Sequence, residues 1–191
     1  MILYINSCVR KESRTNRIAK ALIEKLGDEY TELKLCEENL KPLNEATLEK
    51  RTNLIAEGDY TDPIFDYAKQ FASADTIVIS APYWDFSFPA LLKIYIENIY
   101  AIGVVSSYDE NGNPAGLCRA DRLYYITTAG GPYVPDFSFG YIKALAEQCF
   151  GINDVELISA EMLDVYGFDA EKIVADTIKN FDGDITGNSN G

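Results

Sequence analysis

The chain has 191 residues, 47% of them hydrophobic, and its 30 Asp and Glu outnumber its 17 Lys and Arg, which gives a formal net charge of −13. A chain of this length and composition can bury the core of one domain, and its acidity disfavours nucleic acid and anionic membranes as partners. The complete absence of histidine excludes Ser-His-Asp and Cys-His nucleophile sites, so any chemistry must come from other side chains or from a cofactor.

The cysteines and the first residues point to an intracellular protein. The start, MILYINSC, lacks the basic leader and long apolar stretch of a signal peptide, and no apolar run approaches the length needed to cross a membrane. The four cysteines, Cys8, Cys36, Cys118 and Cys149, are far apart and form no C-x-x-C pair. We therefore expect reduced thiols in a cytoplasmic protein with no membrane insertion, no disulfide framework and no metal site.

The first third of the chain predicts two strands and two helices. The apolar run at residues 2–5 is typical of a buried strand, and a polar loop follows at residues 6–16. Ile18, Leu22 and Leu26 then recur every four residues, which predicts an amphipathic helix ended by Gly27. Residues 30–35 alternate like a second strand, and residues 36–63 are polar, with a helical stretch near residues 45–57 and no clear strand.

The rest of the chain alternates between apolar runs and helical patterns. A helix is expected from Pro63, and residues 76–79, 123–127 and 155–159 read as buried strands. A helix after residues 87–89, with Ser87 as its N-cap, is apolar over a wide arc, which leaves room for a subunit contact. Residues 108–116 are turn-rich, and helices are expected at residues 141–150 and 173–181.

Five strands that alternate with helices predict an α/β fold, a five-stranded parallel sheet with helices on both faces. The predicted domain spans residues 1–181, and the polar, glycine-rich residues 182–191 are expected to be a flexible tail. In doubly wound sheets, ligands lie beyond the carboxyl ends of the strands. The sequence therefore predicts a site made by the loops after the first, third and fourth strands.

The loop at residues 6–16 links a strand to a helix start, where backbone N–H groups and the helix dipole favour an anion. It has no glycine, so it is neither a Walker A loop nor a G-x-G-x-x-G turn. Ser13 or Thr15 could instead serve only as the helix cap. Five cations lie within residues 10–20, either as a solvated basic face or as a local anion site: Arg10, Lys11, Arg14, Arg17 and Lys20.

The other two loops suit a flat ring. Residues 81–89 place Tyr83, Trp84, Phe86 and Phe88 at a strand end, although loop aromatics often simply pack on a neighbouring helix. The Gly130-Gly131 pair allows close backbone approach to a ligand, or makes only a tight turn. A phosphate, a flat ring and a close backbone approach together describe flavin mononucleotide (FMN).

At these loops the sequence resembles the flavodoxin-like FMN-dependent NAD(P)H:quinone oxidoreductases and azoreductases, over almost the whole chain. The residues that carry the resemblance are Ser7, the run SRTN at residues 13–16, PYWDF at residues 82–86, TAGG at residues 128–131 and a hairpin at residues 108–117. The family's strand order is 2-1-3-4-5. Asp85 stands where the family has asparagine, and Tyr133 lies where relatives often carry histidine or another polar residue.

The resemblance implies an FMN site, and its residues are Ser7, Ser13, Arg14, Thr15, Asn16, Pro82, Tyr83, Trp84, Asp85, Phe86, Thr128, Ala129, Gly130, Gly131 and Tyr133. No side chain is predicted to be catalytic, because the flavin carries the hydride; Tyr133 is a predicted substrate contact. NADH or NADPH is the expected donor, and a quinone or an azo compound the expected acceptor, in a ping-pong cycle. The resemblance also implies a homodimer with the active site at the interface.

Two other functions remain open at this stage. One is a non-catalytic, flavodoxin-like electron carrier, which the acidic surface would suit, although the threonine- and glycine-rich phosphate loop of flavodoxins is absent here. The other is a flavin-free regulatory module with the same fold. A pure carrier would show almost no steady-state NADH oxidation with a quinone, and a regulatory module would not take up FMN.

Overall fold

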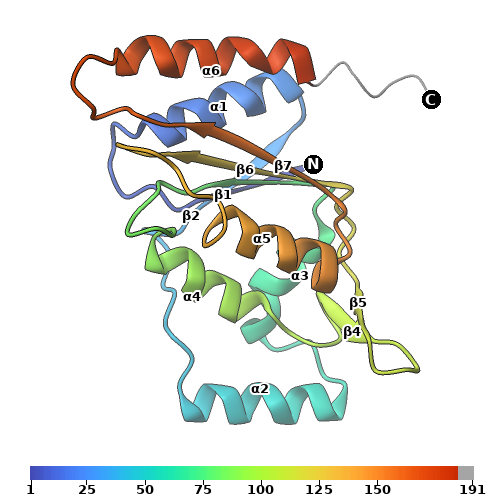
Figure 1. The fold of residues 1–191 in the computed structure, drawn as a ribbon. Helices are drawn as coiled ribbons and strands as arrows, with labels where there is room; N and C mark the ends of the chain where they lie inside the picture. The colour runs from blue at the N-terminus through green and yellow to red at the C-terminus, as the bar shows by residue number, and fades with distance from the viewer. Residues whose placement is uncertain (185–191) are drawn as a thin grey trace.

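The computed structural model describes residues 1–184, the last three of them by backbone alone, and contains the predicted five-stranded parallel sheet (Figure 1). Its order is β2-β1-β3-β6-β7, which confirms the predicted 2-1-3-4-5 order. The strands are β1 (Ile2–Asn6), β2 (Tyr30–Lys34), β3 (Thr76–Ser80), β6 (Arg122–Thr128) and β7 (Asp154–Ala160). All pairs within it are parallel, so the loops after β1, β3, β6 and β7 meet at one edge.

Helices cover both faces of the sheet (Figure 1). One face packs on α1 (Arg14–Leu26) and α6 (Ala170–Asp184), and the other on α3 (Asp66–Ser73), α4 (Ala90–Ile99) and α5 (Phe139–Leu145). Alternate residues of each central strand enter the two cores: Tyr4 faces α1, whereas Leu3 and Ile5 face the other side. The alternation explains why β1 is apolar at four successive positions, Ile2 to Ile5.

The helix α1 carries the caps that its sequence predicts. Ser13 is the N-cap and its side chain accepts a hydrogen bond from the N–H of Asn16, while Gly27 ends the helix at a φ of 71°. Ile18, Leu22 and Ile23 are buried against the sheet. These two caps define where the first loop ends and where the helix stops.

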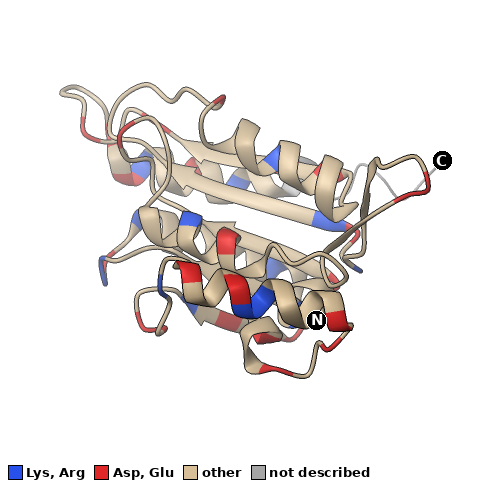
Figure 2. Cartoon of the chain, turned by 90° about the horizontal axis from the view of Figure 1, so that it is seen from below, with Lys and Arg blue, Asp and Glu red and all other residues tan. Residues whose placement is uncertain are grey.

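Two segments lie outside the two layers. The helix α2 (Glu45–Glu57) has no buried residue, and Figure 2, where it lies nearest the viewer, shows acidic and basic residues along it. The short strands β4 (Ser106–Tyr108) and β5 (Pro114–Gly116) form the predicted antiparallel hairpin. A one-turn helix, η1 (Pro63–Phe65), precedes α3, and α5 continues as a π-helical segment, η2 (Ala146–Phe150), closed by Gly151.

Two predicted details differ from the structure. Ser87 is not an N-cap: α4 begins at Ala90 without a side-chain cap, and the Ser87 hydroxyl instead donates to the Phe137 carbonyl. The helix α6 runs to Asp184, so it includes the first residues of the predicted tail. The remainder of that tail, residues 185–191, lies outside the described residues. None of the described helices is both long and apolar enough to span a bilayer.

Candidate functional site

A cleft of about 450 Å³ opens at the carboxyl edge of the sheet, where the sequence places the site. It lies within the volume range of small-ligand pockets. Residues from all three predicted loops line it, together with two residues that follow β7. The lining residues are Cys8, Val9, Arg10, Glu12, Ser13, Arg14, Thr15, Pro82, Tyr83, Trp84, Thr128, Ala129, Gly130, Leu163 and Asp164.

One end of the cleft is the start of α1. Ser13 caps the N–H of Asn16 and its carbonyl accepts from Arg17, whereas the N–H groups of Arg14 and Thr15 have no partner within the described residues. Such orphan donors and the helix dipole favour an anion. The guanidinium of Arg14 is held at the cleft by Asp164, with 2.9 Å between Nη1 and Oδ1. This end is therefore suited to a phosphate group.

The first and third loops are tied together beneath this end. The hydroxyls of Thr15 and Thr128 are 2.6 Å apart, and Thr15 is buried. Gly130 approaches the segment after β7: its carbonyl accepts from the N–H of Asp164, and a Cβ at this position would lie 2.6 Å from Asp164 Oδ2. A side chain at residue 130 would have to move the Asp164 carboxylate, which is also the ion-pair partner of Arg14.

The aromatic loop forms a tight turn at the other end of the cleft. The backbone groups of Trp84 and Ser87 exchange two hydrogen bonds, and Asp85 and Phe86 between them have φ values of 50° and 66°. Two successive positive φ angles define a type I′ turn, in which aspartate, like asparagine, is tolerated because its short polar side chain stabilises the left-handed region. Replacement of the family's asparagine by Asp85 therefore preserves the turn.

A bulky residue with positive φ is a backbone outlier and stores strain. Phe86 is such a residue, and it is 63% exposed. The turn carries Trp84, 43% exposed, at the cleft, and the Phe86 ring meets the Tyr83 ring edge to face with 6.2 Å between the centroids. Tyr83 is fixed behind them, because its N–H donates to Thr128 and its ring meets Tyr133 edge to face at 4.9 Å.

Of the fifteen residues predicted for the site, nine line the cleft: Ser13, Arg14, Thr15, Pro82, Tyr83, Trp84, Thr128, Ala129 and Gly130. Asp85, Phe86, Gly131 and Tyr133 lie beside these in the same loops but do not line it. The Tyr133 hydroxyl is 2.9 Å from Ser138 Oγ, and burial raises the pKa of Tyr133. This hydroxyl is therefore engaged within its own loop.

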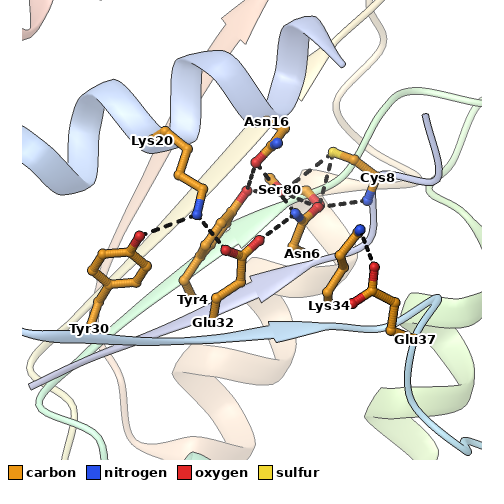
Figure 3. Close-up of polar contacts among 10 residues, drawn as sticks. All are labelled: Tyr4, Asn6, Cys8, Asn16, Lys20, Tyr30, Glu32, Lys34, Glu37 and Ser80. Atoms are coloured by element: carbon orange, nitrogen blue, oxygen red, sulfur yellow. Dashed lines mark hydrogen bonds and ion pairs between the residues drawn. The ribbon is translucent and has the colours of Figure 1, made fainter. Parts of the chain in front are cut away.

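The side chains of Ser7 and Asn16 do not line the cleft. The buried Ser7 hydroxyl donates to the carbonyl of Ser80 at 2.8 Å, so it joins β1 to β3. The side chain of Asn16 turns toward Tyr4 and Asn6 and lines a second groove on the other side of the first loop (Figure 3). Neither side chain lines the cleft with Ser13, so their predicted role in FMN binding stays a prediction.

Six lining residues were not predicted. Cys8, Val9, Arg10 and Glu12 belong to the predicted loop but lack a distinguishing motif, and Leu163 and Asp164 follow β7. Burial raises the pKa of the Cys8 thiol, and hydrogen bonds with Ser13 and Ser80 only partly offset this rise. The thiol is thus a neutral part of the floor of the cleft.

The comparisons with known proteins agree with this architecture. The model of a family described by its flavodoxin-like fold matches residues 1–183, so the chain belongs to this family. It is 35% identical to the FMN-dependent NADH:quinone oxidoreductase of Coprothermobacter proteolyticus, over 93% of this chain and 94% of the relative. It is 36% identical to FMN-dependent NADH:quinone oxidoreductase 2 of Clostridium acetobutylicum, with the same coverage.

Solved structures share the fold. An azoreductase from Bacillus anthracis superposes with a TM-score of 0.79 over 94% of this chain and 95% of its own, at 21% identity. An FMN-dependent NADH-azoreductase from the same species, in complex with FMN, superposes with a TM-score of 0.76 over 94% of both chains, at 23% identity. At these identities the likeness establishes the fold alone.

Proposed function

We propose that this protein is an FMN-dependent oxidoreductase that passes electrons from NADH or NADPH to quinones or azo compounds. The observation that carries the proposal is the cleft itself, which joins orphan N–H groups at a helix start to an aromatic turn. The names of the relatives, FMN-dependent NADH:quinone oxidoreductases, support the same activity. No observation in the structure favours an electron carrier or a regulatory module.

The residues of the cleft fit FMN in their chemistry. Ser13, Arg14 and Thr15 would offer hydroxyl, guanidinium and backbone donors to its phosphate, and the loops of Trp84 and Gly130 would border its ring. When bound, the flavin supplies hydride acceptance and donation. The protein's part is to bind and orient the cofactor and to leave one face open to donor and acceptor in turn, which is a ping-pong cycle.

We also propose a cytoplasmic homodimer whose interface borders the cleft. Trp84, Phe86 and Phe137 are large, exposed side chains near its aromatic end, with exposed fractions of 43%, 63% and 64%. The Ser87 hydroxyl joins the two loops that carry them. Apolar surface at a cleft mouth is typical of an interface. A second copy there would complete the wall of each active site.

The purified protein tests the proposal. We expect a yellow protein that retains FMN and oxidises NADH or NADPH in the presence of a quinone. The assay is run with and without added FMN, and NADH and NADPH are compared at equal concentration. A colourless protein that does not take up FMN contradicts the proposal, and a yellow protein without quinone-dependent oxidation indicates a carrier.

Asp85 yields a prediction about the flavin potential. Asparagine keeps the left-handed turn conformation but removes a carboxylate beside the aromatic end of the cleft, where negative charge disfavours the reduced, anionic flavin. Asp85→Asn should therefore raise the midpoint potential, on the order of 20 mV for a surface charge in a two-electron couple. A redox titration against wild type measures this, and an unchanged potential would mean that the carboxylate does not act on the ring.

A further inference from the structure

A second polar groove, of about 360 Å³, lies on the β2 side of the first loop. It shares Cys8 and Arg10 with the cleft, so the two cavities lie on either side of one segment. Most of its residues are drawn in Figure 3. The groove is lined by Asn6, Cys8, Arg10, Lys11, Asn16, Lys20, Glu32, Lys34 and Glu37.

A chain of buried and partly buried hydrogen bonds fixes the carboxamide of Asn16. The N–H of Cys8 donates to Asn6 Oδ1 at 2.9 Å, so the other end of Asn6 must be its amide nitrogen. That nitrogen donates to Glu32 and to Asn16 Oδ1, at 2.8 and 3.3 Å. Tyr4 also donates to Asn16 Oδ1, at 2.7 Å (Figure 3).

The orientation of Asn16 follows from its neighbours. Because the Asn6 amide nitrogen requires an acceptor, the Asn16 oxygen faces the sheet, where it also accepts from the Tyr4 hydroxyl, and its NH2 group faces away from them. This NH2 group has no partner within the described residues, and Asn16 lines the groove. The network thus presents a fixed, unused donor to the groove.

The charges of the groove leave an excess of cations. Glu32 is engaged by Asn6 and Lys20; burial opposes its charge, but these hydrogen bonds outweigh burial and lower its pKa. Lys34 pairs with Glu37. Arg10 and Lys11 have no ion-pair partner among the described residues. Four cations against two carboxylates leave a net charge of two positive units (4 − 2) in a protein of net charge −13.

We propose that this groove binds a phosphate group, held by the Asn16 NH2 group and by Lys11 and Arg10. Charge-assisted donors from several directions are what a phosphate requires. The ligand is either free inorganic phosphate or the phosphate of a nucleotide that extends past the first loop. The groove does not depend on the function proposed above, because Lys11 and Asn16 line it and not the cleft.

Isothermal titration of the purified protein with inorganic phosphate, at constant ionic strength, tests the proposal. We expect saturable binding, with a site that Ser13→Asp at the phosphate end of the cleft leaves intact. Asn16→Asp keeps the oxygen that accepts from Tyr4 and Asn6 but replaces the NH2 donor with a negatively charged oxygen, which repels phosphate. It should weaken phosphate binding at least about tenfold. Lys11→Gln removes one exposed cation and should weaken it about two- to fivefold.

Asn53→Asp is the matched control, because it makes the same charge change on the exposed face of α2; it should bind phosphate as wild type does. Absence of saturable binding overturns the proposal. So does binding that is unchanged in both Asn16→Asp and Lys11→Gln, or binding that Ser13→Asp abolishes while these two variants keep it, since that ion occupies the cleft.

Competition identifies the source of the phosphate. If the groove serves a nucleotide, adenosine 2′,5′-bisphosphate displaces inorganic phosphate at lower concentration than 5′-AMP. If it serves free phosphate, neither nucleotide competes better than inorganic phosphate itself. Both results support a phosphate group as the ligand, and the titration of Asn16→Asp decides whether the groove is the site.

Discussion

Ser13→Glu should abolish retention of FMN. The residue caps α1 and lines the end of the cleft where the N–H groups of Arg14 and Thr15 are unpartnered. A carboxylate there would meet the phosphate at close range in a partly enclosed site, which we expect to cost at least about 2.7 kcal/mol, or a hundredfold in affinity. Fluorescence titration of the FMN-free protein with FMN measures the loss.

Two further variants separate charge from capping. Ser13→Asp adds the same charge but keeps a good N-cap, so it should fold like wild type and still lose FMN. Ser13→Ala removes the cap without adding charge, so it should lose about 1 kcal/mol of stability and much less affinity. If Ser13→Asp binds FMN as wild type does, the first loop is only a helix cap and the phosphate lies elsewhere.

The sequence predicted the parts of the fold that local patterns determine. Apolar runs marked four strands of the sheet and an alternating pattern marked β2, and their alternation with helices predicted the edge at which the loops meet, whereas the strand order came from the resemblance to the family. Ser13 and Gly27 were recognisable as helix ends because capping is local chemistry. The location of the cleft followed from topology alone.

The details that the sequence did not predict depend on residues far apart in the chain. Ser87 stands shortly before a proline, as an N-cap residue often does, but its hydroxyl donates to the Phe137 carbonyl, fifty residues away. The direction of Asn16 is set by Tyr4 and Asn6 in β1. Asp164 follows β7 without any motif, and it enters the cleft because its N–H pairs with Gly130.

Gly116 is a second position at which an added side chain has a large expected effect, this time on stability. It lies in β5, which packs on the end of η2, and a Cβ there would lie 2.0 Å from the nitrogen of Gly151 and 2.1 Å from the carbonyl carbon of Phe150. Both obstacles are backbone atoms. Gly151 has a φ of 80°, and its neighbour Phe150 accepts from the N–H of Cys118, so neither can move without losing the helix end.

Gly116→Ala should therefore lower the free energy of unfolding by about 3 kcal/mol or more, the upper range for overpacking. Chemical denaturation measures the change. Gly140→Ala is the matched control, because this glycine lies in α5 and the nearest atom to its Cβ is 3.6 Å away; it should be neutral or stabilising by up to about 1 kcal/mol. The hairpin lies at the opposite end of the sheet from the site loops (Figure 1), so Gly116→Ala molecules that fold should retain wild-type affinity for FMN. Equal stability of the two variants would show that β5 does not pack on η2 in solution.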